Sequence, residues 1–318
     1  MSIIIGTYTP EWGHTALAAG FGKLYALRSL PERSSLCVFA MPEDGEDVLT
    51  IDSLTLLGEY QTPGRHSCYI TLLDSQAVVS DYTSGTLSLF NLDSQGIPIG
   101  SPETVTFKGQ GPDKVRQALS HIHSSWVSPD GSSIVIVDLG GDKIYRYSIK
   151  GGHIALDTKE ELTLPAGCGP RHCAFNTSGN RLYVATELSD EVLTYSWPEM
   201  NLLHRCIVND SLPRGGGHII YDPDGYLFVS SRLKNDGIAV FKLQNDGTPE
   251  KYAYIKTGAH PRHFAISGDG KELVSASRDE DVVEFFTIDL KSRAFVKHKE
   301  HKTEKPVFII LNNYEQSN

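Results

Sequence analysis

The chain has 318 residues, 40% of them hydrophobic, and a formal net charge of −10 with no run of basic residues. This charge disfavours nucleic acid and anionic membranes as partners, and no segment approaches the roughly 20 apolar residues of a membrane-spanning helix. Residues 1–7 lack the basic region and long apolar core of a secretory signal. Five cysteines without a CxxC pair favour reduced thiols and a cytoplasmic location.

Six similar units follow one another along the chain. Each begins with a short phrase containing Pro, Arg or His, continues with a hydrophobic strand, and closes with a second strand that ends on an aromatic residue. The spacings between these aromatics are 51, 57, 48, 46 and 44 residues. Such a period, with only β-type segments, is typical of propeller blades. The closing aromatics are Phe39, Phe90, Tyr147, Tyr195, Phe241 and Phe285.

Tight hairpins are predicted inside the clearest units. Ser178-Gly179, Asp224-Gly225 and Asp269-Gly270 each separate two apolar runs, and these pairs supply the positive φ that a short hairpin requires. The runs themselves are β-branched and aromatic and too short for helices. We therefore predict an all-β fold.

The two ends of the chain are both apolar. Residues 3–8 (IIIGTY) and 306–311 (PVFIIL) are expected to pair in one shared blade, which would remove two exposed sheet edges. Six full units and this shared blade predict a seven-bladed β-propeller spanning residues 1–318 as a single domain. Residues 10–22 look too few to complete the shared blade and open the next one, so one blade is expected to lack its outer strands.

Polar residues recur at equivalent points of successive units. Because the innermost strand of each blade lines the axis of a propeller, side chains far apart in sequence can meet there. At the openings of the inner strands stand Arg65, His66, His121, His123, Arg171, His172, His218, Arg262 and His263. At the ends of the following strands stand Asp81, Asp138, Glu187, Arg232 and Arg278.

Each of these residues also has a purely structural interpretation. Asp81 and Asp138 follow strands and are expected mainly to cap turns. His66 and His218 are more often hydrogen-bonded structural residues than catalysts, and a Pro-Arg-His phrase can serve as an ion pair between blades. Glu187 ends an apolar strand, where a carboxylate is costly unless paired, so an arginine partner is expected.

Metal and nucleophile chemistry are weaker hypotheses. His121 and His123, at i and i+2 on one strand face, could begin a metal site, but arginines at equivalent positions would repel a divalent cation. Arginine forks suit a carboxylate or a phosphate better. No Gly-x-Ser-x-Gly elbow, no Walker loop and no phosphate cradle before a helix is present. No cofactor is expected.

Several motifs together resemble the lactonase family of seven-bladed propellers, which includes the propeller-type 6-phosphogluconolactonases and the 3-carboxy-cis,cis-muconate lactonizing enzymes. The resemblance runs over essentially the whole chain. The motifs are Gly6-Thr7-Tyr8-Thr9, Ser120-His121-Ile122-His123, Gly169-Pro170-Arg171-His172, Tyr183-Val184-Ala185-Thr186-Glu187 and Val229-Ser230-Ser231-Arg232.

The resemblance implies that His123, Arg171, Glu187 and Arg232 are catalytic. Substrate-binding roles are expected for His121, His172, His66, Arg262 and His263. Two positions depart from the family pattern: Arg28 follows Leu24-Tyr25-Ala26-Leu27 where Asn-Glu is usual, and Asp81-Tyr82 replaces Asn-Tyr.

The leading functional hypothesis is hydrolysis of a small anionic sugar-acid lactone, with 6-phosphogluconolactone as the first case. A muconate-type cycloisomerisation is the sibling reaction. A non-catalytic propeller that binds a peptide or protein on its rim is the alternative from another class, although the Trp-Asp and Gly-His marks of WD40 repeats do not recur. No pattern in the sequence specifies an oligomeric state.

Overall fold

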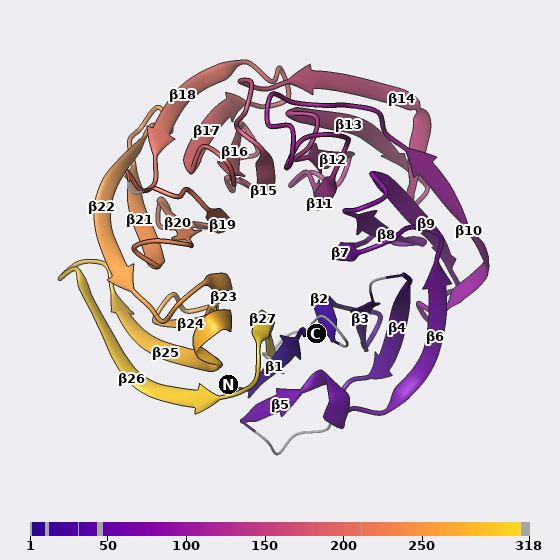
Figure 1. Ribbon diagram of the computed structural model, residues 1–318, viewed down its shortest axis with the longest axis horizontal. Coiled ribbons are helices and arrows are strands. Elements are labelled where there is room, and N and C mark those ends of the chain that lie inside the picture. The colour runs from indigo at the N-terminus through magenta and orange to yellow at the C-terminus, as the bar shows by residue number, and fades with distance from the viewer. Residues whose placement is uncertain (1, 10–12, 31, 43–46, 211, 313–318) are drawn as a thin grey trace.

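The computed structural model describes residues 2–9, 13–30, 32–42, 47–210 and 212–312. Within these ranges the chain forms β-strands and two 3₁₀ turns, η1 (Ile51–Ser53) and η2 (Arg278–Glu280). Seven sheets stand around a common axis, each with one strand facing the axis and the others stacked outward (Figure 1). The predicted seven-bladed β-propeller is confirmed.

Blades 1 to 6 are four-stranded antiparallel sheets whose strands run outward in chain order, except that β5 interrupts the numbering in blade 1. The inner strands are β2 (His14–Gly20), β7 (Ser67–Leu72), β11 (Ile122–Val127), β15 (Pro170–Phe175), β19 (Gly216–Asp222) and β23 (Pro261–Ile266). The second strands are β3 (Lys23–Ser29), β8 (Gln76–Asp81), β12 (Ser133–Asp138), β16 (Arg181–Thr186), β20 (Tyr226–Ser231) and β24 (Glu272–Ser277).

The third strands carry the aromatic residues that mark the repeat. They are β4 (Ser34–Ala40), β9 (Thr86–Leu92), β13 (Lys143–Lys150), β17 (Glu191–Ser196), β21 (Gly237–Leu243) and β25 (Val282–Asp289). The outer strands are β6 (Leu56–Thr62), β10 (Pro98–Thr106), β14 (His153–Thr163), β18 (Leu202–Ile207), β22 (Pro249–Lys256) and β26 (Ala294–Lys302).

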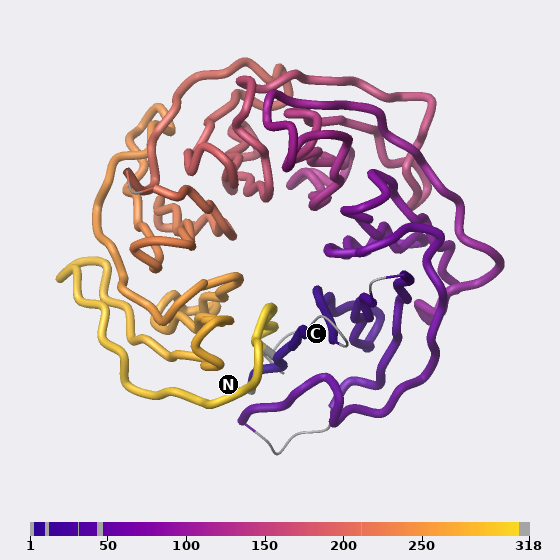
Figure 2. The backbone as a smooth tube through the Cα atoms, in the orientation of Figure 1, coloured from indigo at the N-terminus to yellow at the C-terminus, as the bar shows by residue number. Residues whose placement is uncertain are grey.

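The seventh blade closes the ring. In it β1 (Ser2–Thr7) pairs antiparallel with β27 (Pro306–Asn312), with Ile4 opposite Ile310, as predicted. The third strand of this blade, β5 (Val48–Thr50), runs parallel to β1 and comes from the segment between β4 and β6. The blade therefore has three strands instead of four, and the first and last described strands, β1 and β27, lie side by side within it (Figure 2).

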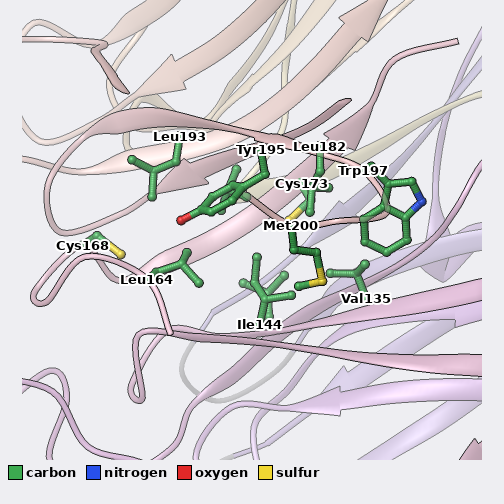
Figure 3. Close-up of a cluster of buried hydrophobic side chains, with 12 residues drawn as sticks. Val135, Ile144, Leu164, Cys168, Cys173, Leu182, Leu193, Tyr195, Trp197 and Met200 are labelled. Carbon is green, nitrogen blue, oxygen red and sulfur yellow. The ribbon is translucent and has the colours of Figure 1, made fainter. Parts of the chain in front are cut away.

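The core lies between blades. Second and third strands are buried on both faces, because the blades stack face against face. Figure 3 shows one such cluster, in which Val135 and Ile144 of blade 3 pack against Leu182, Leu193 and Tyr195 of blade 4. Outer strands are largely exposed, as the burial pattern of β26 illustrates.

Hairpin turns form where the sequence predicts them. Gly179, Gly225 and Gly270 adopt φ values of 64°, 85° and 69°, which residues with a Cβ atom adopt only at a cost. No helix in the described ranges is long and apolar enough to cross a membrane.

Each inner strand contains one register shift near its start. On β15, Pro170 lies opposite Thr186 and His172 opposite Ala185, so Arg171 is the extra residue of a β-bulge. The same shift falls at Cys68 on β7, His123 on β11 and Arg262 on β23. We call the extra residue the bulge position. Bulges redirect side chains out of the regular alternation of a strand.

We expect the closing pair of strands to be essential for stability. Ile309 on β27 is 2% exposed and packs with Ile3, Ile5 and Val274. Replacing Ile309 with Ala should lower the free energy of unfolding by about 2–5 kcal/mol, because a large-to-small change in a packed core leaves a cavity. Urea unfolding would measure this, with Val296→Ala on the exposed strand β26 as the control. If both changes lowered the free energy of unfolding equally, the pairing of β1 with β27 would not have the importance expected here.

Candidate active site

A second repeated position lies at the exit of each second strand. There the backbone N–H of Glu187 donates to the carbonyl of Gly169, that of Arg232 to Gly215, and that of Arg278 to His260. These contacts tie the residue after each second strand, or in β3 the last residue of the strand, to the residue before the inner strand. The strand-exit residues are Tyr8, Ser29, Tyr82, Leu139, Glu187, Arg232 and Arg278.

Asp81 and Asp138 lie one residue before the strand-exit position, not at it. The carboxylate of Asp81 accepts hydrogen bonds from the hydroxyls of Ser67 (2.5 Å), Ser88 (2.7 Å) and Thr86 (3.0 Å). Asp138 accepts from the backbone N–H groups of His121 and Gly141. Both carboxylates therefore hold strand ends and turns in place, as the structural interpretation of the sequence predicts.

The bulge and strand-exit positions of blades 3 to 5 bring the four predicted catalytic residues together. Oε2 of Glu187 accepts from Nε of Arg171 and from Nη2 of Arg232, both at 2.9 Å. His123 lies beside them, because its ring packs edge-on against that of His172, with centroids 5.2 Å apart, and His172 contacts Arg171. A further arginine, Arg116, donates from Nη2 to Oε1 of Glu187. We call Arg116, His123, Arg171, Glu187 and Arg232 the axial cluster.

Three guanidinium groups keep Glu187 ionised. Burial alone would raise the pKa of this carboxyl, but Arg232 and Arg171, with smaller contributions from His123 and Arg116, hold it well below its usual value. Both oxygens already accept hydrogen bonds. The arginine partner predicted for Glu187 is thus confirmed, and a carboxylate held this way is a weak proton acceptor.

His123 is the buried group with an unused nitrogen. It is 5% exposed, and its Nδ1 has no hydrogen-bond partner among the described residues. Burial and the charge of Arg171 hold its pKa well below the ordinary value, against the opposing effect of Glu187. The ring packs edge-on against Tyr82, with centroids 5.8 Å apart. The imidazole is therefore neutral near pH 7, and its Nδ1 position is not used by any described residue.

Arg232 uses most of its donors within the protein. Its Nη2 reaches Glu187 and the carbonyl of Gly216 (2.7 Å), its Nε reaches the carbonyl of Gly215 (3.1 Å), and its Nη1 lies 3.3 Å from Nε2 of His260. A guanidinium has five N–H groups, so only one remains. Nδ1 of His260 in turn lies 3.4 Å from Asp279. These contacts fix the orientation of Arg232.

His172 and His263, two of the expected substrate-binding residues, lie in an aromatic layer next to the cluster. Nδ1 of His172 lies 2.7 Å from Nδ1 of His218. His218 stacks on His263, and His263 stacks on Phe308 at centroid distances of 4.1 and 3.8 Å. Tyr69 also packs edge-on against His172, with ring centroids 5.3 Å apart. The three histidines are thus buried in ring contacts at the axis of the propeller, and the substrate-binding role of His172 and His263 stays a prediction.

The hydrogen bonds of this layer define its tautomers. Nε2 of His172 lies 3.3 Å from Nη1 of Arg171, and a guanidinium can only donate. His172 therefore carries its proton on Nδ1 and donates it to His218. Through Nε2 of His172, which accepts from Nη1 of Arg171, this layer helps to orient the Arg171 guanidinium.

The remaining predicted residues surround the cluster. His121 stacks on Tyr82 with centroids 4.3 Å apart, and its Nδ1 lies 2.8 Å from the carbonyl of that residue. His66 lies 3.3 Å from the hydroxyl of Tyr8. Arg262 occupies the bulge position of blade 6.

Arg116 was not identified from the sequence. It lies between β10 and β11, outside any strand, and Asp113 fixes this turn by accepting from the N–H groups of Val115 and Arg116. The 57-residue spacing between Phe90 and Tyr147, the longest in the repeat, is the signal that marks this extra segment.

The departures from the family pattern have different outcomes. Nη1 of Arg28 lies 3.4 Å from Oε2 of Glu59, and both side chains are 38% exposed. Arg28 does not occupy the strand-exit position of blade 1, which is held by Ser29. Tyr82 reaches the cluster, because its hydroxyl lies 3.4 Å from Nη2 of Arg116. Among the described residues, no group of three or more His, Cys, Asp or Glu side chains is arranged to hold a metal ion.

Known proteins share this fold and, in part, this sequence. The family model for the seven-bladed β-propeller lactonases matches residues 14–311. A 6-phosphogluconolactonase from Formosa agariphila is 31% identical over 254 residues, covering 75% of this chain and 71% of the relative. One from Bacillus subtilis is 29% identical over 248 residues, covering 74% and 70%.

The solved structures agree with this assignment. The crystal structure of a candidate 6-phosphogluconolactonase from Bacteroides fragilis superposes with a TM-score of 0.87 at 28% identity, over 98% of this chain and 97% of that one. The ring of seven blades, the axial cluster and the match over residues 14–311 lead to one conclusion. The chain belongs to the lactonase family of seven-bladed β-propellers.

Proposed function

We propose that this chain hydrolyses the lactone of a phosphorylated sugar acid, with 6-phosphogluconolactone as the leading substrate. The relatives named 6-phosphogluconolactonase support the reaction type. The observation that carries the proposal is a neutral, buried His123 with an unused nitrogen beside Arg171, whose partner Glu187 is ionised.

His123 is proposed as the general base and then the general acid. Lactone hydrolysis needs an activated water, a stabilised oxyanion and a proton for the leaving alkoxide. His123 accepts a proton from the water that attacks the carbonyl carbon. When the ring C–O bond breaks, the imidazolium returns this proton to the ring oxygen, so that the product is the open hydroxy acid.

Arg171 is proposed to stabilise the oxyanion. Its Nε is used by Glu187 and its Nη1 contacts His172, so Nη2 is left for the carbonyl oxygen. Fixed donors of this kind are worth several kcal/mol in a site shielded from water. Glu187 and Arg232 then act as positioning residues, because their hydrogen bonds are almost fully used inside the protein.

We further propose that the reaction needs no metal and takes place in the cytoplasm, as one step of carbohydrate metabolism. The arginines supply the positive charge that a metal would otherwise provide. All five cysteines are free, which supports a reducing compartment. Residues 1–318 are proposed to act as one domain.

Purified protein should hydrolyse 6-phosphoglucono-δ-lactone with a higher kcat/KM than unphosphorylated glucono-δ-lactone. EDTA should change both values by less than about twofold, because no step is assigned to a cation. A pH-stat assay would measure this, corrected for spontaneous hydrolysis and with 3-carboxymuconolactone included to detect the sibling reaction. Loss of activity on chelation, restored by a divalent ion, would contradict the proposal.

A further inference from the structure

The arginines around the axis differ in how completely their charge is neutralised. Arg171 and Arg232 share Glu187, Arg116 bonds its other oxygen, and Arg278 forms two contacts with Asp279 at 2.8 and 3.1 Å. Arg262 forms no hydrogen bond or ion pair with any described residue. All five of its N–H groups are therefore available.

The backbone places Arg262 in the same way as two residues of the axial cluster. It is the extra residue between Pro261 and His263 on β23, as His123 is on β11 and Arg171 on β15. His263, the next residue, is buried in the aromatic layer with Phe308 and His218. The side chain of Arg262 is thus held at the axis by a rigid inner strand, and it is only partly exposed.

The surroundings of Arg262 suit an anion. Burial and, after it, the charge of Arg262 lower the pKa of His66, and the same charge opposes the rise that burial gives the pKa of Tyr8. The Tyr8 hydroxyl and Nε2 of His66 lie 3.3 Å apart. Burial, together with Arg232 and Arg278, lowers the pKa of Arg262 to about 10, so it remains a cation at neutral pH. A partly buried cation without a counter-ion is costly unless a ligand supplies the negative charge.

We propose that Arg262 binds the phosphate of the substrate, while the axial cluster acts on the lactone carbonyl. A guanidinium fork matches two phosphate oxygens, and we assign a third to the hydroxyl of Tyr8, which lies 3.3 Å from the imidazole of His66. Arg262 is then the residue that selects phosphorylated over unphosphorylated lactones. This inference rests on the proposed function, because it assigns one part of that substrate.

The test is a comparison of two substrates in three variants. Arg262→Gln should lower kcat/KM on 6-phosphoglucono-δ-lactone by roughly 10²-fold, mainly through KM, because a desolvated charge pair is worth a few kcal/mol. The same change should leave kcat/KM on glucono-δ-lactone within about threefold. Arg262→Lys keeps the charge without the fork and should give an intermediate loss. Arg293→Gln, in the exposed β25–β26 hairpin, is the matched control.

Equal losses on both lactones in Arg262→Gln and Arg262→Lys would overturn the inference, since Arg262 would then serve the shared ring. Calorimetric titration with 6-phosphogluconate and with gluconate separates this outcome from failure of the proposed function. If the wild-type protein hydrolyses neither lactone but prefers 6-phosphogluconate, and the preference disappears in Arg262→Gln, the phosphate site stands without the hydrolase. If the wild type binds both acids equally, Arg262 does not recognise phosphate.

Discussion

Replacing His123 with Ala should lower kcat on the best lactone by roughly 10²–10⁴-fold, the usual contribution of a positioned acid–base group. The same change should leave the melting temperature unchanged or slightly higher. The reason is that Nδ1 of His123 is buried without a partner among the described residues, so its removal relieves an unpaired polar group. Loss of activity without loss of stability separates a functional role from a structural one.

His153→Ala is the matched control, because this residue lies in the β13–β14 hairpin on the opposite face of the ring. His123→Asn provides a second, smaller change at the site itself. Stopped assays corrected for spontaneous hydrolysis would supply kcat and KM. If folded His123→Ala and folded Glu187→Ala both retain full kcat/KM, the mechanism proposed for this site is wrong.

The folded protein should lose stability steeply as the pH falls below about 6.5, the ordinary pKa of histidine. Burial, with the positive charge of Arg171, lowers the pKa of His123, His172 and His263 well below that value, and that of His218 to about 3. These imidazoles bind protons in the unfolded chain but not in the folded one. Stability that is present above pH 6.5 is therefore lost as the pH falls through it.

Two carboxyl groups oppose this loss. Burial raises the pKa of Asp81 and of Asp190 to about 6, so both bind protons in the folded state before the unfolded chain does. Burial also lowers the pKa of His14, His66 and His260. The histidines therefore outnumber these two aspartates, so unfolding takes up protons and the free energy of unfolding falls with pH between about 5.5 and 4.5.

Urea unfolding at pH 7.5, 6.5, 5.5 and 4.5 would measure this slope. His218→Gln should make it shallower by about one proton, whereas His153→Gln, in the β13–β14 hairpin, should leave it unchanged. A free energy of unfolding that stays constant from pH 7.5 to 5 would show that the buried histidines do not control acid stability.

The sequence predicts those parts of the fold that depend on neighbouring residues in the chain, namely the buried strands and the tight turns. Runs such as residues 182–185 are continuously apolar because two blades bury them, and Ser178-Gly179 provides the turn before them. The outer strands were not predicted individually. In β26, for instance, the exposed surface carries lysines, glutamate and histidines, and its pairing with β25 depends on the neighbouring strand and not on its own composition.

Only those residues of the candidate site that stand at repeated positions were predicted from the sequence. Arg171 and Glu187 stand at repeated positions, so their meeting at the axis follows from the propeller itself. The sequence analysis placed Asp81 and Asp138 at the same repeat position as Glu187, and this was wrong by one residue. In the sequence, an acidic residue at the end of a strand that binds neighbouring hydroxyl or N–H groups cannot be told from one that directly follows the strand. Arg116 stands in an irregular segment that no period describes.

The bulges have a consequence for how such a ring can change its chemistry. A bulged residue lies outside the ladder of paired backbones, so exchanging its side chain leaves the hydrogen bonds of the sheet intact. In this chain the same position holds a thiol at Cys68, an imidazole at His123 and guanidinium groups at Arg171 and Arg262. The side chains at the bulge positions can therefore be exchanged one at a time. New substrate preferences can arise by such single substitutions while the sheets of the propeller stay the same.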